Sequence, residues 1–145
     1  MTPPAFDNTE KRAGFKSFVH RQLFEKLILQ LFVTELTKRV PATAAVVTMP
    51  NPGWMGTVAE KIIAVPNRLL GRTPSAAARV VTTGAVAFGA EAHGQYIEDG
   101  KLQPKAPFVY TPEGEKVGKT IWDEVMSELS FANVKEIVRE LEKEA

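Results

Sequence analysis

The chain has 145 residues, of which 44% are apolar, so its length and composition suit one folded domain. Lys and Arg total 18 and Asp and Glu total 17, and the resulting net charge of +1 provides no field for binding nucleic acid or an anionic membrane. The sequence contains no cysteine, which excludes disulfides, zinc–thiolate sites, iron–sulfur clusters and a cysteine nucleophile.

The amino-terminal residues carry prolines and acidic side chains where a signal peptide needs an apolar core. No apolar run approaches the ~18 residues of a membrane span, so we expect no such span and a cytoplasmic location. Residues 1–13 are predicted to be a loose lead-in, and residues 14–145 are predicted to form a single domain.

A long helix is predicted from about residue 15 to residue 40. Its apolar residues recur at spacings of three and four, glycine and proline are absent, and Pro41 ends it. Lys38 and Arg39 lie in the last turn, where cations suit the negative end of the helix dipole. The apolar face is wide and rich in aromatic residues, so we expect it to be buried against a sheet, a partner subunit or both.

Two short strands are predicted. AAVVTMP, residues 44–50, is a continuous apolar run, which is typical of a parallel strand covered on both faces. GQYI, residues 94–97, is the second strand and is followed by an Asp-Gly turn. The residues after this turn, LQPKAPFVY, are interpreted as an irregular loop.

Further helices are predicted between and after the strands. The segment 57–71 has a helical pattern that Pro66 interrupts, and the segment 73–89 begins with Thr73 as N-cap and Pro74 in the first turn. Two more helices are expected at 111–129 and 132–144. Helices that alternate with strands indicate an α/β fold, here with about two parallel strands and five or so helices. This order resembles the second half of a larger fold.

The loop NPGWMGT, residues 51–57, follows the first predicted strand. Ligands of open α/β sheets bind beyond the carboxyl ends of the strands, and the two glycines of this loop let the backbone approach a ligand closely. Thr57 adds a hydroxyl that can donate or accept a hydrogen bond. On composition alone, an ordinary strand-to-helix turn is the better explanation of the loop.

Four blocks in this order resemble the carboxyl half of a short-chain dehydrogenase/reductase, in particular its fungal retinol-dehydrogenase-like branch. They cover about residues 22 to 129 and are EKLILQLFVTELTKRV, VVTMPNPGWMGT, LLGRTPSAAARVV and HGQYIEDGKLQPKAPFVYTPEGEKVGKTIWDEV. The resemblance implies a partial Rossmann-like unit that lacks the amino-terminal half of the fold. It also implies NAD(P)-dependent oxidation or reduction of a carbonyl or alcohol, a small hydrophobic substrate and, in fungi, secondary metabolism.

The resemblance also assigns candidate site residues. Pro52, Gly53 and Thr57 match the Pro-Gly-x-x-x-Thr loop that lies against the nicotinamide in relatives. Lys26 occupies the lysine of the Tyr-x-x-x-Lys pair, but Gln22 stands at the tyrosine position. An amide does not titrate at neutral pH, so the proton-transfer group is missing. Without that partner, the simpler interpretation of Lys26 is a solvated lysine.

The glycine-rich pattern TGxxxGxG, through which the family binds its dinucleotide cofactor, does not occur in the sequence. We therefore expect a truncated protein that is inactive alone and that pairs through residues 16–39, either with a copy of itself or with the missing half as a separate chain. A non-redox enzyme such as an isomerase or cyclase, and a helix-mediated interaction module, are the alternatives. His20, His93 and Trp122 are interpreted as structural residues.

Overall fold

The computed structural model describes residues 15–53 and 73–143. Within these ranges it contains four α-helices and one three-stranded sheet. The helices are α1 (Phe15–Thr37), α3 (Pro74–Val86), α4 (Pro112–Glu128) and α5 (Val134–Lys143). The strands are β1 (Met49–Asn51), β2 (Tyr96–Glu98) and β3 (Lys101–Gln103). Short 3₁₀ turns lie at Ala90–Ala92, Pro107–Tyr110 and Leu129–Ala132, which are η3, η4 and η5.

The helix limits follow the local sequence signals. The Thr73 side chain accepts a hydrogen bond from the Ala76 N–H and begins α3, and Thr111 accepts one from the Gly114 N–H and begins α4. Both caps are followed directly by a proline, whose fixed φ suits the first turn. The predicted helices at 73–89, 111–129 and 132–144 are therefore confirmed within a few residues at each end. The predicted helical segment 57–71 lies outside the described residues.

The sheet differs from the prediction in two ways. β1 and β2 are parallel, as expected, but β1 covers only the end of the predicted 44–50 strand and continues to Asn51. β3 was not predicted, and it pairs antiparallel with β2 in a hairpin whose turn is Asp99 and Gly100, both with positive φ. An Asp-Gly pair with positive φ at both residues is the preferred geometry of a two-residue hairpin turn.

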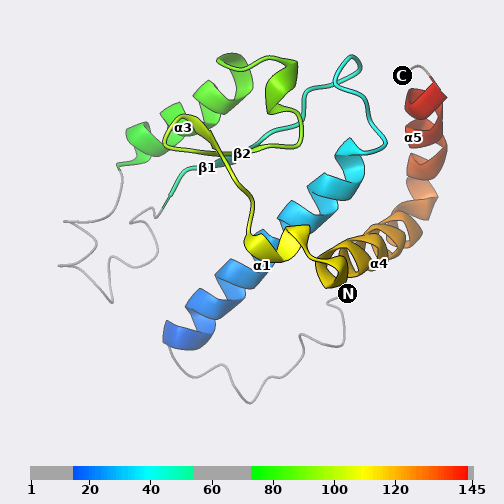
Figure 1. The fold of residues 1–145 in the computed structure, drawn as a ribbon, viewed down its shortest axis with the longest axis horizontal. Helices are drawn as coiled ribbons and strands as arrows, with labels where there is room; N and C mark the ends of the chain where they lie inside the picture. Colours follow the sequence, from blue (N-terminus) through cyan, green and yellow to red (C-terminus); the bar gives the residue numbers. More distant parts are fainter. Residues whose placement is uncertain (1–14, 54–72, 144–145) are drawn as a thin grey trace.

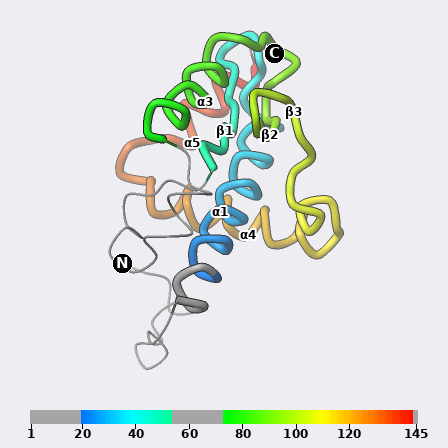
Figure 2. Tube along the Cα trace, turned by 90° about the vertical axis from the view of Figure 1, so that its left-hand side faces the viewer, coloured from blue at the N-terminus to red at the C-terminus, as the bar shows by residue number. Residues whose placement is uncertain are grey.

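Helices α1 and α3 lie on opposite sides of the sheet, and α4 lies along α1 on the side away from α3 (Figures 1 and 2). Gly84 of α3 approaches Pro50 and Ile97 so closely that an added methyl would lie 3.0 Å from Pro50 Cβ. Pro50 and Ile97 are register partners, so this pair faces α3. Because successive strand residues point to opposite faces, the pairs Met49–Tyr96 and Asn51–Glu98 face α1.

A buried hydrophobic cluster joins α1, α4 and α5. Trp122, Met126 and Val138 are buried there, and Phe32 of α1 stacks on Trp122 with ring centroids 5.7 Å apart. The Arg39 guanidinium lies 4.4 Å from the Trp122 ring centroid, which adds a cation–π contact. This packing explains why the predicted wide apolar face of the first helix is only partly used by the sheet: its other flank is covered by α4.

His93 connects the turn before β2 to the segment between α1 and β1. Its Nδ1 accepts from the Val47 N–H at 3.3 Å, and its Nε2 lies 2.8 Å from the Val40 carbonyl oxygen. These two bonds fix the neutral tautomer with the proton on Nε2. The structural role predicted for His93 is consistent with these contacts.

Candidate functional site

Three of the predicted site residues, Lys26, Pro52 and Gly53, lie at the carboxyl end of β1. The Lys26 ammonium, on the exposed middle of α1, donates to the Asn51 side-chain oxygen at 3.2 Å. The same oxygen accepts the Gly53 backbone N–H at 3.1 Å. Lys26 and the Pro52–Gly53 turn therefore converge on one atom, although 25 residues separate Lys26 from Asn51.

Asn51 also reaches the neighbouring strand. Its side-chain N–H donates to a Glu98 carboxylate oxygen at 2.7 Å, across the register pair that the two residues form in the sheet. The Tyr96 side chain lies one register step back on the same face, near enough for the Asn51 amide to favour its ionised form. Burial and the negative charge of Glu98 raise the pKa of Tyr96, because both disfavour the phenolate more than the Asn51 contact favours it.

A cavity of about 200 Å³ opens beside these groups. Most of its wall is apolar and comes from α1 and β1, and its polar lining residues are Lys26, Gln30, Thr48, Asn51 and Tyr96. The apolar residues that line it are Leu29, Val33, Met49, Pro50 and Pro52. A small, mainly apolar cavity with a few convergent polar groups is the usual form of a small-molecule site.

Gln22, the predicted replacement of a tyrosine, lies one turn before Lys26 on the exposed surface of α1. Its amide donates to Glu25 at 3.4 Å, and Glu25 is also paired with Arg21 at 3.0 Å. No titrating hydroxyl therefore stands at this position next to Lys26. Thr57, the last residue of the predicted loop, lies outside the described residues.

Asn51 is the functional candidate that sequence reasoning missed. In the sequence it is only the first residue of the loop NPGWMGT, and no motif assigns a role to its amide. The signal that finds it is the register of β1 and β2, which pairs Asn51 with Glu98 on the face toward α1. That register could not be assigned from two short apolar runs.

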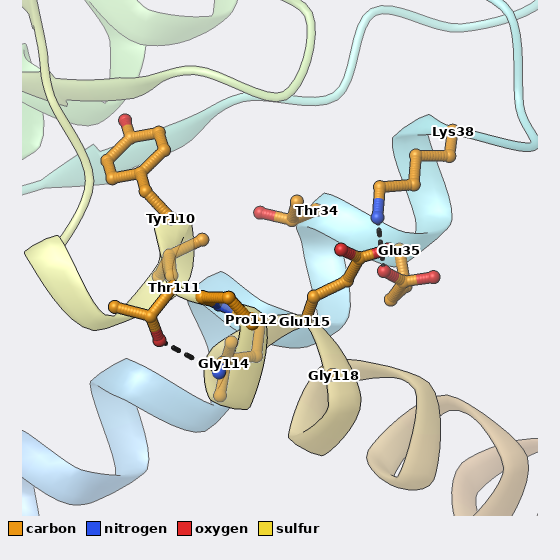
Figure 3. A pocket seen from close by; sticks show the side chains of 11 residues that line it. Thr34, Glu35, Lys38, Tyr110, Thr111, Pro112, Gly114, Glu115 and Gly118 are labelled. Atoms are coloured by element: carbon orange, nitrogen blue, oxygen red, sulfur yellow. Dashed lines mark hydrogen bonds and ion pairs between the residues drawn. The ribbon is translucent and has the colours of Figure 1, made fainter.

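A second cavity, of about 330 Å³, lies between α1 and the start of α4 (Figure 3). Its polar groups already have partners within the protein: Glu35 is paired with Lys38 and Arg39, and the Thr111 hydroxyl oxygen accepts from the Gly114 N–H. A third cavity, of about 550 Å³, adjoins the first through Gln30 and Tyr96. It is lined by Lys105, whose pKa is lowered by burial and by the charge of Lys38.

No group of three or more His, Asp or Glu side chains within the described ranges is arranged to hold a metal ion. None of the helices in these ranges is both long enough and apolar enough to cross a membrane.

The chain is similar to several curated fungal proteins named short-chain dehydrogenases. It is 39% identical to short-chain dehydrogenase fogG of Aspergillus ruber over 138 residues, which are 87% of this chain and 40% of that protein. It is 28% identical to short chain dehydrogenase virL of Hypocrea virens over 81% of this chain and 37% of that protein. A short chain dehydrogenase of Arthrobotrys oligospora is 30% identical over similar shares, 81% and 38%.

The chain spans about 40% of the length of these curated relatives. No family model matches the chain, and no solved structure matches it significantly. The short-chain dehydrogenase resemblance found in the sequence is thus supported by named relatives. None of the names reported above carries the retinol-dehydrogenase branch, which stays a prediction.

Proposed function

We propose that the chain is the carboxyl-terminal part of an NAD(P)-dependent short-chain dehydrogenase/reductase, in which the end of β1 faces the nicotinamide end of the cofactor. The observation that carries the proposal is the convergence of Lys26 and the Gly53 N–H on Asn51. By the resemblance, Lys26 and Gly53 match family positions. The similarity to the Aspergillus ruber relative covers 87% of the chain.

The residues at the end of β1 fit the nicotinamide riboside end of the cofactor. The cavity of about 200 Å³ has apolar walls that suit a flat ring, and the Lys26 ammonium at its rim suits ribose hydroxyls. The Pro52–Gly53 backbone would lie against the ring. When bound, the nicotinamide supplies or accepts the hydride. The sequence contains no glycine-rich turn of the kind that binds the cofactor's pyrophosphate, so we infer that other residues bind it.

We also propose that the chain has no catalytic activity on its own. Gln22 offers no proton at the position where relatives place a tyrosine, and loss of such a group typically costs ~10²–10⁴ in rate. We further propose a cytoplasmic protein with a small hydrophobic carbonyl or alcohol substrate. Its partner would be a second copy or the remaining part of the fold, bound through α1.

A chimera tests this proposal. The segment of the Aspergillus ruber relative that matches this chain is replaced by the chain, and NADPH and NADP⁺ binding is measured by calorimetry. We expect the chimera to bind the cofactor and to show little turnover of carbonyl substrates that the unaltered relative reduces. The added change Gln22→Tyr is expected to raise kcat by about 10²–10⁴ because it restores the proton-transfer group.

The matched control is Leu23→Tyr, which adds the same phenol at the next position, where the side chain is 60% exposed and turned about 100° around the helix. This variant should leave turnover unchanged. A folded chimera that binds neither cofactor, or equal rates for the two tyrosine variants, would contradict the proposed function.

A further inference from the structure

Asn51 is the point where α1, β1, β2 and the Pro52–Gly53 turn meet. Its side-chain oxygen accepts from Lys26 Nζ and from the Gly53 N–H, and its side-chain nitrogen donates to Glu98. An amide has one acceptor oxygen and one donor nitrogen, so each half of the group is engaged. Within the described ranges, no other side chain makes hydrogen bonds to α1, to β2 and to the Pro52–Gly53 turn.

The three groups bonded to the Asn51 side chain are compatible with only one orientation of its amide. Lys26 and the Gly53 N–H are donors only, so the oxygen must face them, whereas the Glu98 carboxylate accepts and must face the nitrogen. A flipped amide would set donor against donor on one side and oxygen against carboxylate on the other. Glu98 therefore keeps the acceptor oxygen directed at the lysine.

This arrangement has a consequence for Lys26. An ammonium has three N–H donors, and Asn51 accepts one of them. A flexible, exposed lysine side chain loses much of its rotamer freedom when it is held at one point. Lys26 also lines the apolar cavity, and its other two donors can bond a ligand there that carries neighbouring hydroxyl groups.

We propose that Asn51 is a positioning residue that holds the Lys26 ammonium and the Pro52–Gly53 turn in place for a ligand with neighbouring hydroxyls. The inference rests on the proposed function, which supplies the ribose as that ligand. Asn51 itself is not a catalytic residue, since its amide bonds to protein groups and acts through Lys26.

The test uses the purified chain without cofactor. The rate of acetylation of Lys26 is measured by mass spectrometry relative to that of Lys116, an exposed lysine on α4. Asn51→Leu keeps the size of the side chain but removes the acceptor, so Lys26 should react about two- to fivefold faster, which corresponds to an exposed interaction of ~0.4–1 kcal/mol. The Gly53 amide should exchange its hydrogen faster in the same variant.

Asn51→Asp separates positioning from mere structural support. A carboxylate keeps an acceptor oxygen and adds a negative charge beside Lys26, so Lys26 should react more slowly than in the wild type, by about twofold or more. A purely structural role predicts the opposite, because a carboxylate beside Glu98 disturbs the strand pair at least as much as leucine does. Gln103→Leu, which removes an exposed amide from β3, is the matched control and should change neither rate.

Opposite shifts for Asn51→Leu and Asn51→Asp would support the inference. Unchanged Lys26 reactivity in a folded Asn51→Leu variant, or faster reaction in both variants, would overturn it. If Asn51→Leu unfolds, all lysines will react faster together. The Asn51→Asp variant then decides: slower acetylation of Lys26 than in the wild type supports the inference, and faster acetylation overturns it. None of these readouts requires a nucleotide, so their failure is distinguishable from a failure of the chimera to bind NADPH.

Discussion

At the scale of single residues, the most constrained charge of the described chain is Glu35. Its side chain is buried in α1, and its two oxygens accept from Lys38 and Arg39. Burial alone would raise the pKa of Glu35, but the hydrogen bonds and charges of Lys38 and Arg39 outweigh it and lower the pKa. The Arg39 guanidinium also lies over Trp122, so the ion pair is continuous with the helix core.

Glu35→Gln should destabilise the fold by about 1–3 kcal/mol at pH 7, because two partly buried cations lose their counter-charge. The lowered pKa makes this contribution complete above the ordinary value of 4.5, and it is lost as the pH falls through the folded-state pKa. Urea unfolding between pH 7 and pH 3 should therefore show a smaller acid loss in Glu35→Gln than in the wild type. Glu115→Gln, which removes an exposed ion pair with Lys119, is the control.

Parallel acid profiles for the wild type and Glu35→Gln would contradict this account of the Glu35 carboxylate. So would a stability loss in Glu115→Gln as large as that in Glu35→Gln, because the effect would then not depend on burial.

At the scale of elements, the start of α4 depends on one glycine. Gly114 is buried, and a methyl at its Cα would collide with the Phe108 carbonyl oxygen of η4. That oxygen also accepts from the Thr111 hydroxyl, whose oxygen caps the Gly114 N–H. The turn of η4 and the first turn of α4 are therefore packed too closely for any side chain at this position.

Gly114→Ala should destabilise the chain by about 1–3 kcal/mol through overpacking, although alanine is the better helix former by ~1 kcal/mol. Gly118→Ala on the same helix is the matched control. There the added methyl would lie 3.4 Å from the Glu35 Cγ, which is an ordinary contact, so the propensity gain should leave stability equal or higher. Thermal unfolding of the two variants gives the comparison, and equal midpoints would show that the η4 contact does not limit the helix.

The helices were predictable and the strands only in part, for a physical reason. The periodicity of α1 and the Thr-Pro caps of α3 and α4 are local signals, and they fixed these helices within a few residues. The strands have three residues each, and β3 is fully exposed, so no alternation marks it. The Asp-Gly turn was recognised as the end of a strand but not as the centre of a hairpin.

The candidate site was predictable to the same degree. Family positions identified Lys26 and the Pro52–Gly53 turn, which the structure brings together. Asn51 and Glu98 were missed as a pair because their contact depends on the parallel register of β1 and β2. Asn51 and Glu98 are 47 positions apart in the chain, and only the folded sheet makes them neighbours.

At the scale of the whole molecule, two surfaces lack cover within the described residues. β1 pairs with β2 on one edge only, so its other edge has no partner strand in these ranges. The helix α1 exposes large apolar side chains, among them Leu23 at 60% and Leu29 at 54%. Exposed sheet edges and apolar helix faces are the surfaces through which chains associate.

We therefore expect the purified chain to self-associate through α1 at micromolar concentrations, as measured by light scattering across a dilution series. Leu23→Glu should weaken the association at least about tenfold in Kd, because burial of a leucine contributes ~1.5–3 kcal/mol and each factor of ten requires ~1.4 kcal/mol. Val86→Glu is the matched control: it places the same charge at a valine that is 76% exposed at the end of α3, and it should leave Kd unchanged. A wild-type chain that stays monomeric over the whole series, or equal weakening by the two glutamates, would exclude α1 as the contact surface.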